Sequence, residues 1–415
     1  MSRLVAVALA LGLLVRLGYS WHGHRAGYLP TNSDGYESIA LSLLDRGEYA
    51  MEAGRPTSLR EPSYPLFIAG VYVVFGRHPG VVIFIHCILS VLTGWLLWLT
   101  GKRLFGEKIS FASLLVFMVY PQSVYYCSYF FRETWLSFLF GLLLWASLSW
   151  SAAPGDPAGD MGAKWGGLAS AAFGLANSAV LPACGLAGVL LWVAAPARTR
   201  PRRVFFYVGP LLLAFTAWSA RNYFIHGRFV AGSTHGGEEF YQALIVPPED
   251  LGTARQGEIV TADPILMDAA TLPEAERNAL LMKASLVWIE AHPGTFLSRV
   301  VAGFLKYWRL WPYQRNYHHS YAALVLASLL SDAWIIPLGF LGLWFFRARW
   351  RECAVLPAGI FAMTLVYGAV HAVIRYRLPL MGGMILFACA AAARLGGVGT
   401  TIFPSPRRRS TRISL

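Results

Sequence analysis

The stretch GVVIFIHCILSVLTGWLLWLT at residues 80–100 contains no Asp, Glu, Lys or Arg, and Lys102 and Arg103 follow it closely. As a helix rising 1.5 Å per residue, it is long enough to cross a hydrocarbon core of about 30 Å. The rest of the chain agrees, because 56% of its 415 residues are hydrophobic and only 14% are charged. Soluble proteins carry roughly 25% charged residues. The sequence therefore predicts an all-α, polytopic membrane protein.

Ten apolar stretches have lengths suited to a membrane span. They cover residues 4–20, 80–100, 109–125, 131–150, 165–181, 182–195, 204–220, 321–346, 353–370 and 378–393. We expect the first to be an uncleaved span. Residues 65–76 are also apolar but reach only about 18 Å as a helix, so we expect them to lie flat at the membrane interface.

Basic residues account for a net charge of +13 and gather at breaks between the apolar stretches, at residues 102–108, 198–203, 347–351 and 407–412. With residues 65–76 lying flat, all four clusters fall on the side of the N-terminus, as the positive-inside rule requires. We therefore predict a multi-pass protein of the cell inner (cytoplasmic) membrane with both termini in the cytoplasm. These clusters suit membrane lipid headgroups and imply no nucleic acid.

Three segments then face outward, at residues 21–76, 126–132 and 221–320. Within the third, residues 272–292 and the stretch after Pro293 carry apolar side chains at helical spacing, which predicts two amphipathic helices on the outer membrane surface. We divide the chain into an N-terminal transmembrane module at 1–220, the outward loop at 221–320, and C-terminal transmembrane helices with a basic cytoplasmic tail at 321–415.

The first outward loop carries Asn32-Ser33-Asp34-Gly35-Tyr36-Glu37 at the start of an amphipathic stretch. In one interpretation Asp34 is a helix N-cap and Glu37 the reciprocal capping residue. In the other, Asp34 is a general base held just outside the membrane face. The two are compatible, because capping also fixes the geometry of a carboxylate.

Two further outward segments combine charged and aromatic residues. Arg60-Glu61-Pro62-Ser63-Tyr64-Pro65 leads into the flat segment, either as an interfacial anchor through Tyr64 or as part of a site. Arg132 and Glu133 begin a span at the second outward turn. They are either an interfacial pair, with Glu133 favoured by the helix N-terminus, or part of a cavity mouth shared with Asp34.

Three arginines lie on the outward side against the positive-inside bias, and each therefore needs a partner: Arg221, Arg375 and Arg377. The guanidinium group suits bidentate binding of a phosphate. The alternative is a salt bridge to one of the outward carboxylates.

Motifs for metal or nucleotide chemistry are missing from the sequence. His318 and His319 follow Tyr317, but no third ligand has a recognisable spacing, so we predict no metal there. There is no Gly-rich phosphate loop, no nucleophile elbow and no His-Glu-x-x-His. The five cysteines lie singly in the sequence and are expected to be buried thiols.

Taken in order, these motifs resemble the GT-C glycosyltransferase superfamily, in particular the dolichyl-phosphate-mannose–protein mannosyltransferases and the bacterial aminoarabinose transferases. The resemblance rests on Asp34-Gly-Tyr-Glu-Ser-Ile-Ala, Gly47-x-Tyr49, Arg60-x-Pro62-x-Tyr64-Pro65, Lys102-Arg103-Leu-Phe-Gly106, Glu133, Trp218-x-x-Arg221-Asn222-Tyr223 and Arg375-Tyr376-Arg377-x-Pro379. One departure is Asn177-Ser178-Ala179, which stands where many relatives place an Arg.

The resemblance implies a hexosyl- or pentosyltransferase that moves a sugar from a polyprenyl-phosphate-linked donor to a protein, lipid or glycan acceptor on the outer face. It implies that Asp34 activates the acceptor and that Glu133 is the second acidic position, with residues 1–220 as the catalytic module. The candidates for binding the donor phosphate are Arg221, Arg375 and Arg377. Further substrate-site candidates are Tyr36, Glu37, Arg60, Glu61, Tyr64, Arg132 and Tyr376. No soluble cofactor is needed, although some relatives use a divalent metal.

Three other functions compete with this one. A lipid-linked sugar flippase or transporter would need charged residues within its spans, whereas most spans are clean and Arg16 lies near an outer end. An O-antigen ligase type enzyme would place its site on a late large loop, without the Asp34 segment. A non-catalytic scaffold of an envelope-polysaccharide complex has no need for Asp34 together with Glu133.

Overall fold

The computed structural model describes residues 1–25, 34–247, 250, 254–312 and 320–397. These residues are all-α, as predicted, apart from one small antiparallel hairpin of β1 (Ala50–Glu52) and β2 (Arg55–Pro56). Asn32, Ser33, the Tyr317–His319 motif and the basic tail at 407–412 lie outside the described residues.

Five helical segments are long and apolar enough to cross a membrane, and they make this a multi-pass membrane protein. They are α1 (Ser2–Arg25), α4 (Pro79–Phe105), α10 (Arg200–His226), α16 (Tyr321–Phe345) and the unit Ile374–Leu395 formed by η3 (Ile374–Arg377) and α19 (Leu378–Leu395). A sixth is possible if η2 (Arg347–Arg349) and α17 (Trp350–Cys353) form one span with α18 (Val355–Ala369), across a bend of 86°.

The predicted count of ten spans is therefore not reached among the described residues. The other predicted spans form shorter or less apolar helices: α5 (Glu107–Met118), α7 (Glu133–Ser147), α8 (Pro157–Gly174) and α9 (Leu181–Ala194). The stretch 109–125 illustrates the reason. Pro121 cannot donate a backbone hydrogen bond, so α5 ends at Met118 and a separate six-residue helix, α6 (Pro121–Tyr126), follows.

The first outward loop contains α2 (Tyr36–Arg46), the hairpin and α3 (Ser63–Phe75). The last is a helix of 13 residues, too short for a hydrocarbon core, as the sequence analysis expected of residues 65–76. Helices α2 and α3 pack on each other through Tyr36, Tyr64 and Tyr72.

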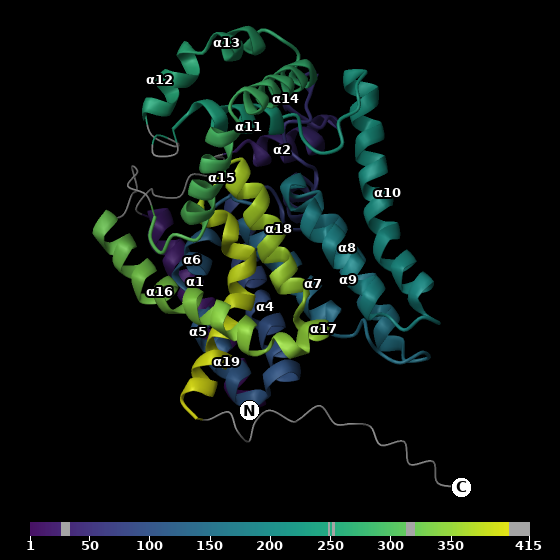
Figure 1. Cartoon of the computed structure of the whole chain (residues 1–415), viewed down its shortest axis with the longest axis vertical. Helices are drawn as coiled ribbons and strands as arrows, with labels where there is room; N and C mark the ends of the chain where they lie inside the picture. The colour runs from purple at the N-terminus through teal and green to yellow at the C-terminus, as the bar shows by residue number, and fades with distance from the viewer. Residues whose placement is uncertain (26–33, 248–249, 251–253, 313–319, 398–415) are drawn as a thin grey trace.

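The long outward loop forms a cap at one end of the molecule (Figure 1). It contains α11 (Gly236–Ile245), α12 (Ala254–Ala262), α13 (Pro264–Ala270), α14 (Glu274–Ala291) and α15 (Pro293–Tyr307). The two helices predicted around Pro293 are thus confirmed as α14 and α15, whereas α11 to α13 were not predicted. On α15, Leu297, Val301 and Leu305 are exposed, which suits a helix lying in an interface.

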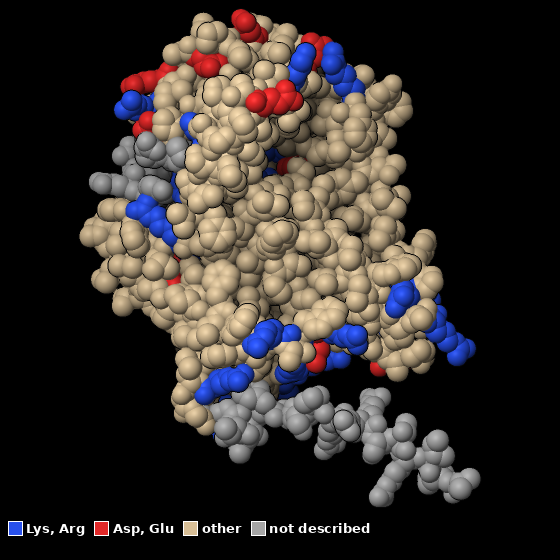
Figure 2. Space-filling view, viewed as in Figure 1, with Lys and Arg blue, Asp and Glu red and all other residues tan. Residues whose placement is uncertain are grey.

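The opposite end of the molecule holds the N-terminus and the end of α19 (Figure 1). Figure 2 shows Lys and Arg side chains gathered at this end and most of the visible Asp and Glu side chains on the cap. Helix α19 lies in the middle of the bundle, and 72% of its apolar window is buried. The residues just before α19, from His371 to Arg377, therefore lie close to the centre of the capped end.

Candidate functional site

Three segments far apart in the sequence converge beneath the cap: the start of α2, the turn before α7 and the turn η3. Burial raises the pKa of Tyr36 to about 12. The guanidinium groups of Arg132 and Arg60 lower this pKa, and the carboxylates of Asp34 and Glu133 raise it further. The Tyr36 ring thus lies within electrostatic reach of all four charged groups. Figure 2 shows a hollow below the cap with acidic and basic atoms at its bottom.

Asp34 precedes a sharp turn into α2. The N-cap is Gly35, which has a left-handed φ of 74° and makes no side-chain cap bond, a conformation that glycine adopts without strain. Glu37 accepts a hydrogen bond from the Tyr72 hydroxyl instead. The capping interpretation of Asp34 and Glu37 is therefore wrong. Among the described residues no hydrogen bond or ion pair reaches the Asp34 carboxylate, and it remains available to a substrate.

Arg60 holds the Asp34 segment from the side of α3. Its Nε donates to the backbone oxygen of Asp34 over 3.1 Å, and its guanidinium lies 5.6 Å from the centre of the Tyr36 ring. Tyr64 is fully buried and packs edge-on against Tyr36, with ring centres 4.9 Å apart. Tyr64 is therefore not an interfacial anchor. It forms the support behind Tyr36.

Glu61 and Arg132 form a buried ion pair at 3.3 Å. The second oxygen of Glu61 accepts hydrogen bonds from the backbone N and the hydroxyl of Ser178, over 2.8 and 2.7 Å. Arg132 also donates to the Ala176 carbonyl over 3.0 Å. The segment with Asn177 and Ser178, where this sequence departs from the family pattern, thus supplies donors to Glu61.

Glu133 and Arg375 form the second pair of the site. The Arg375 Nε lies 3.3 Å from Glu133 Oε1 but without hydrogen-bond alignment, and the other oxygen of Glu133 is buried with no partner among the described residues. The Arg375 guanidinium lies over the rings of Phe131 and Tyr376, at 4.8 and 5.0 Å. This pair keeps unused hydrogen-bonding capacity at the centre of the site.

The Tyr376 ring stacks on that of Tyr367, with centres 4.7 Å apart, and Asn177 donates to the Tyr367 hydroxyl over 2.6 Å. An aromatic wall therefore connects η3 with the segment that holds Glu61. Aromatic faces of this kind suit the apolar face of a sugar ring or a prenyl chain.

Arg221 lies apart from these pairs and holds the hairpin of the first outward loop. Its Nη1 donates to the Thr57 carbonyl over 2.7 Å and its Nη2 to the Tyr49 carbonyl over 3.1 Å. Its guanidinium lies 5.1 Å from the centre of the Tyr49 ring and 4.9 Å from that of the Trp218 ring. The sequence suggested that Arg221 binds a phosphate or forms a salt bridge to a carboxylate. The contacts in the structure are instead hydrogen bonds to carbonyl groups and packing against aromatic rings.

Arg377 also lies outside the convergence. It is fully buried and paired over 2.5 Å with Asp332 of α16, which is itself fully buried. The sequence analysis missed Asp332 and counted the middle of most spans as free of charge. The signal that could have identified Asp332 is a single carboxylate within an apolar stretch. Arg16 is likewise fully buried, and donates to the carbonyls of Phe117 and Met118 at the end of α5.

Two carboxylates of the cap were also missed. Glu274, at the start of α14, accepts hydrogen bonds from Ser58 N and the Thr57 hydroxyl. Glu239, on α11, contacts His235 over 2.8 Å and His371 over 3.1 Å. These contacts tie the cap to the first outward loop and to the loop before η3. Only a folded structure brings them together, since no local motif connects them.

Some members of the resembling family use a divalent metal, but two of the carboxylates beneath the cap already face protein partners. Glu61 already receives three hydrogen-bond donors and Glu133 faces a guanidinium. The described residues contain no group of three or more His, Cys, Asp or Glu side chains that could hold a metal ion. No metal step is derived for this site.

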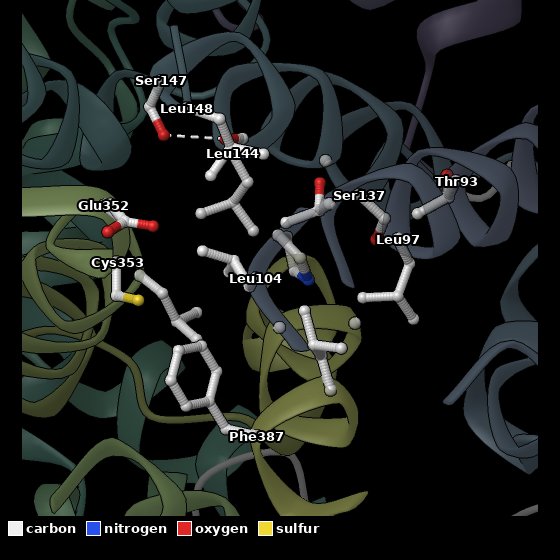
Figure 3. A pocket seen from close by; sticks show the side chains of 17 residues that line it. Thr93, Leu97, Leu104, Ser137, Leu144, Ser147, Leu148, Glu352, Cys353 and Phe387 are labelled. Atoms are coloured by element: carbon white, nitrogen blue, oxygen red, sulfur yellow. Dashed lines mark hydrogen bonds between the residues drawn. The ribbon is translucent and has the colours of Figure 1, made fainter. Parts of the chain in front are cut away.

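A small apolar pocket lies away from these residues, between α4, α7, α18 and α19 (Figure 3). Leu97, Leu104, Leu144 and Phe387 line it, and Glu352 is its single charged lining residue. With no Lys, Arg or His in its wall, this pocket cannot neutralise a phosphate. The candidate site is therefore the charged hollow beneath the cap.

Comparison with known proteins finds a family match for part of the sequence and solved structures with a similar fold. Residues 56–223, less than half of the chain, match the family model described as dolichyl-phosphate-mannose-protein mannosyltransferase, which confirms the resemblance identified from the motifs. No curated protein matches the chain.

The oligosaccharyltransferase of Archaeoglobus fulgidus, crystallised with zinc and sulfate, is 11% identical with a TM-score of 0.53. The alignment covers 95% of this chain and 49% of that one, so the chain spans about half the length of that protein. ArnT from Cupriavidus metallidurans in the apo state is 15% identical over 87% of this chain and 74% of its own, with a TM-score of 0.37. The likeness to the oligosaccharyltransferase shows the fold alone.

Proposed function

We propose that this protein transfers a sugar from a polyprenyl-phosphate-linked donor to an acceptor beneath the cap. The match of residues 56–223 to the dolichyl-phosphate-mannose-protein mannosyltransferase family model supports this proposal. The observation that carries the proposal is the convergence of Asp34, whose carboxylate has no partner among the described residues, with the incompletely satisfied pair of Glu133 and Arg375. A reaction in which a phosphate is the leaving group is helped by a base next to the attacking acceptor and a fixed cation next to the phosphate.

In the proposed reaction, the acceptor hydroxyl or amine gives its proton to Asp34 as its oxygen or nitrogen attacks the anomeric carbon of the sugar. The bond between that carbon and the donor phosphate oxygen breaks, and the electron pair leaves with the polyprenyl phosphate. Arg375 stabilises the charge that builds on this phosphate, which a fixed guanidinium does better than water. Glu133 orients Arg375 for this purpose.

The remaining substrate-site candidates support these three residues. Arg60 and Tyr36 hold the Asp34 segment, the pair of Glu61 and Arg132 fixes the turn before α7, and Tyr376 lies beside Arg375. Arg221 and Arg377 have all their observed contacts elsewhere. We therefore assign the phosphate to Arg375 and leave the other two outside the reaction.

The membrane placement belongs to the same proposal. The site faces the outer side if the basic end of the molecule faces the cytoplasm, as the positive-inside rule predicts. The ten-span topology, the division into segments 1–220, 221–320 and 321–415, and the choice of the cell inner membrane remain predictions from the sequence.

A lipid-linked sugar flippase is the second candidate, and one observation favours it. Asp332 and Arg16 place charge within helices that could span the membrane, as transporters do. Both are already satisfied by neighbouring groups, which argues for structural roles. The transferase is therefore the better supported function.

The test is transfer of radiolabelled sugar from polyprenyl phosphate in membranes containing the wild type, Asp34→Asn or Asp45→Asn. Asp45 lies on α2, the helix that Asp34 precedes, and forms an exposed pair with Arg77, so its variant is the matched control. We expect transfer to be lost only in Asp34→Asn at equal protein level. Equal transfer by all three proteins would refute Asp34 as the base, and flipping without transfer would favour the flippase.

A further inference from the structure

Asp332 is a fully buried carboxylate near the middle of α16. Placing a charge at membrane depth is costly, so such a residue is retained only where it serves a purpose. Neither the proposed reaction nor the comparisons assign it one. Its contacts show which parts of the molecule it connects.

Three side chains donate hydrogen bonds to Asp332. The Tyr120 hydroxyl reaches Oδ1 over 2.8 Å, Gln122 Nε2 reaches Oδ2 over 2.8 Å, and Arg377 Nη2 reaches Oδ2 over 2.5 Å. Arg377 in turn donates to the carbonyls of Tyr307 and Arg309, over 2.9 and 2.6 Å. Asp332 is thus the centre of a buried network in which its charge is neutralised.

These partners belong to the two segments that carry the central pair of the site. Tyr120 and Gln122 begin the short α6 segment, which continues through the outward turn to Glu133 at the start of α7. Arg377 ends the turn η3, and Arg375 lies two residues before it. One carboxylate therefore holds both the Glu133 segment and the Arg375 segment from behind.

We propose that Asp332 is a positioning residue that sets the distance between Glu133 and Arg375 by holding α6 and η3 together. Its effect on catalysis rests on the proposed function. Asp332 does not touch the substrate, because it is fully buried and its oxygens are occupied by the three donors. The reason for its importance is geometric, since a misplacement of about 1 Å in a reacting group can cost on the order of 100-fold in rate.

The first experiment uses Tyr120→Phe, which removes one bond to Asp332 without creating a charge. The matched control is Tyr207→Phe, because Tyr207 is equally buried and donates over 2.8 Å to the Cys184 carbonyl, between α9 and α10. Hydrogen exchange of the full chain in detergent is followed on residues 126–133. We expect faster exchange there in Tyr120→Phe only, and equal exchange in both variants would overturn the proposal.

Arg377→Lys gives the corresponding test on the other segment. We expect faster exchange at residues 373–377, while α8 and α9 keep the wild-type rate. Unchanged exchange at 373–377 would overturn the proposal, and so would acceleration of the whole chain to the same degree. Neither result depends on activity, so the proposal is decided even if the wild type transfers no sugar and the proposed function fails.

The second experiment is a double-mutant cycle on sugar transfer. We expect Tyr120→Phe to lower kcat about 10-fold with little change in KM in the wild type, and less than twofold in an Arg375→Lys background. Non-additivity of this kind arises when two residues act through one arrangement. Equal losses in both backgrounds would show a merely structural role for Asp332 and overturn the proposal.

Discussion

Two arginines of the turn η3, Arg375 and Arg377, each pair with a buried carboxylate, and the two pairs differ in how many of their hydrogen-bonding atoms have partners. Behind the turn, Asp332 accepts three donors and Arg377 reaches two further carbonyls. On the side of the site, Glu133 faces Arg375 without hydrogen-bond alignment and has one oxygen with no partner in the part of the chain that the structure describes.

This difference is the one we expect between a structural ion pair and a pair that binds a ligand. A buried charge is tolerable when its partners satisfy it, and costly when they do not. Behind the turn both oxygens of Asp332 are satisfied, although Arg377 Nε has no hydrogen-bond partner among the described residues, whereas at the site one oxygen of Glu133 and the Nε of Arg375 have none. The unused hydrogen-bonding atoms of Glu133 and Arg375 therefore support the proposed phosphate site, and the following predictions test the contrast between the two pairs.

The largest expected effect is on stability, from Arg377→Met. This change leaves Asp332 as an unpaired buried carboxylate, which costs about 3–5 kcal/mol of unfolding free energy. Thermal unfolding in detergent measures the loss. The control is the double change Asp332→Leu with Arg377→Met, which removes both charges and should recover most of the stability. A double variant as unstable as the single one would show that the pair is not the source of the loss.

The next effect is on rate, from Arg375→Lys. Lysine supplies a point charge instead of the planar fork that matches a phosphate, and loss of one such contact costs about 10²–10³-fold in transfer rate. Thermal stability should stay close to that of the wild type, because the Glu133 pair is not hydrogen-bonded. Arg394→Lys, at the basic end of the molecule, is the matched control. A fall in stability without a fall in rate per folded molecule would contradict this assignment.

The sequence singled out Glu133 and Arg375 but only one member of the other pair, Arg377, for a physical reason. Glu133 and Arg375 lie at the ends of apolar stretches, where charge is conspicuous and the positive-inside rule assigns a side. Asp332 lies within such a stretch, and its partners at positions 120, 122 and 377 come from three distant segments. Hydropathy finds the helix but not the residues that neutralise a charge within it.

Asp34 shows a different limit. Its spacing to Glu37 fits a capping box, yet Gly35 adopts the left-handed conformation and takes the N-cap position. The hydroxyl of Tyr72, 35 residues further along the chain, donates a hydrogen bond to the Glu37 carboxylate, which the local pattern had assigned to the helix N-cap. Tertiary contacts therefore displaced a local motif, and the Asp34 carboxylate has no partner in the part of the chain that the structure describes.

A smaller effect is expected from the third pair of the capped end, Glu61 and Arg132. Glu61→Gln keeps an acceptor for Ser178 but removes the charge opposite Arg132. Hydrogen bonds to charged groups contribute about 1.5–3 kcal/mol, so we expect a loss in that range on thermal unfolding. Ser178→Ala, which keeps the ion pair, should cost less. If Glu61→Gln is as stable as the wild type, the pair of Glu61 and Arg132 does not stabilise the fold, as we also expect of Glu133 and Arg375.

The smallest effect concerns Glu239 and its dependence on pH. Burial opposes ionisation of this carboxylate, but hydrogen bonds from His235 and His371 outweigh it and hold its pKa well below the usual range. A depressed pKa contributes stability that is present above the unfolded value, about 4.3, and lost only as the pH falls through the folded value.

Glu239→Gln should therefore lower the unfolding temperature at pH 8 and by at least as much at pH 5. The loss should be about 1 kcal/mol or less, because more than a third of the side chain is exposed and solvent screens it. Thermal unfolding at the two pH values measures the difference, with Glu238→Gln on the same turn as the control. No difference between Glu239→Gln and the wild type at either pH would mean that the carboxylate keeps its ordinary pKa and that the cap is not held by the two histidines.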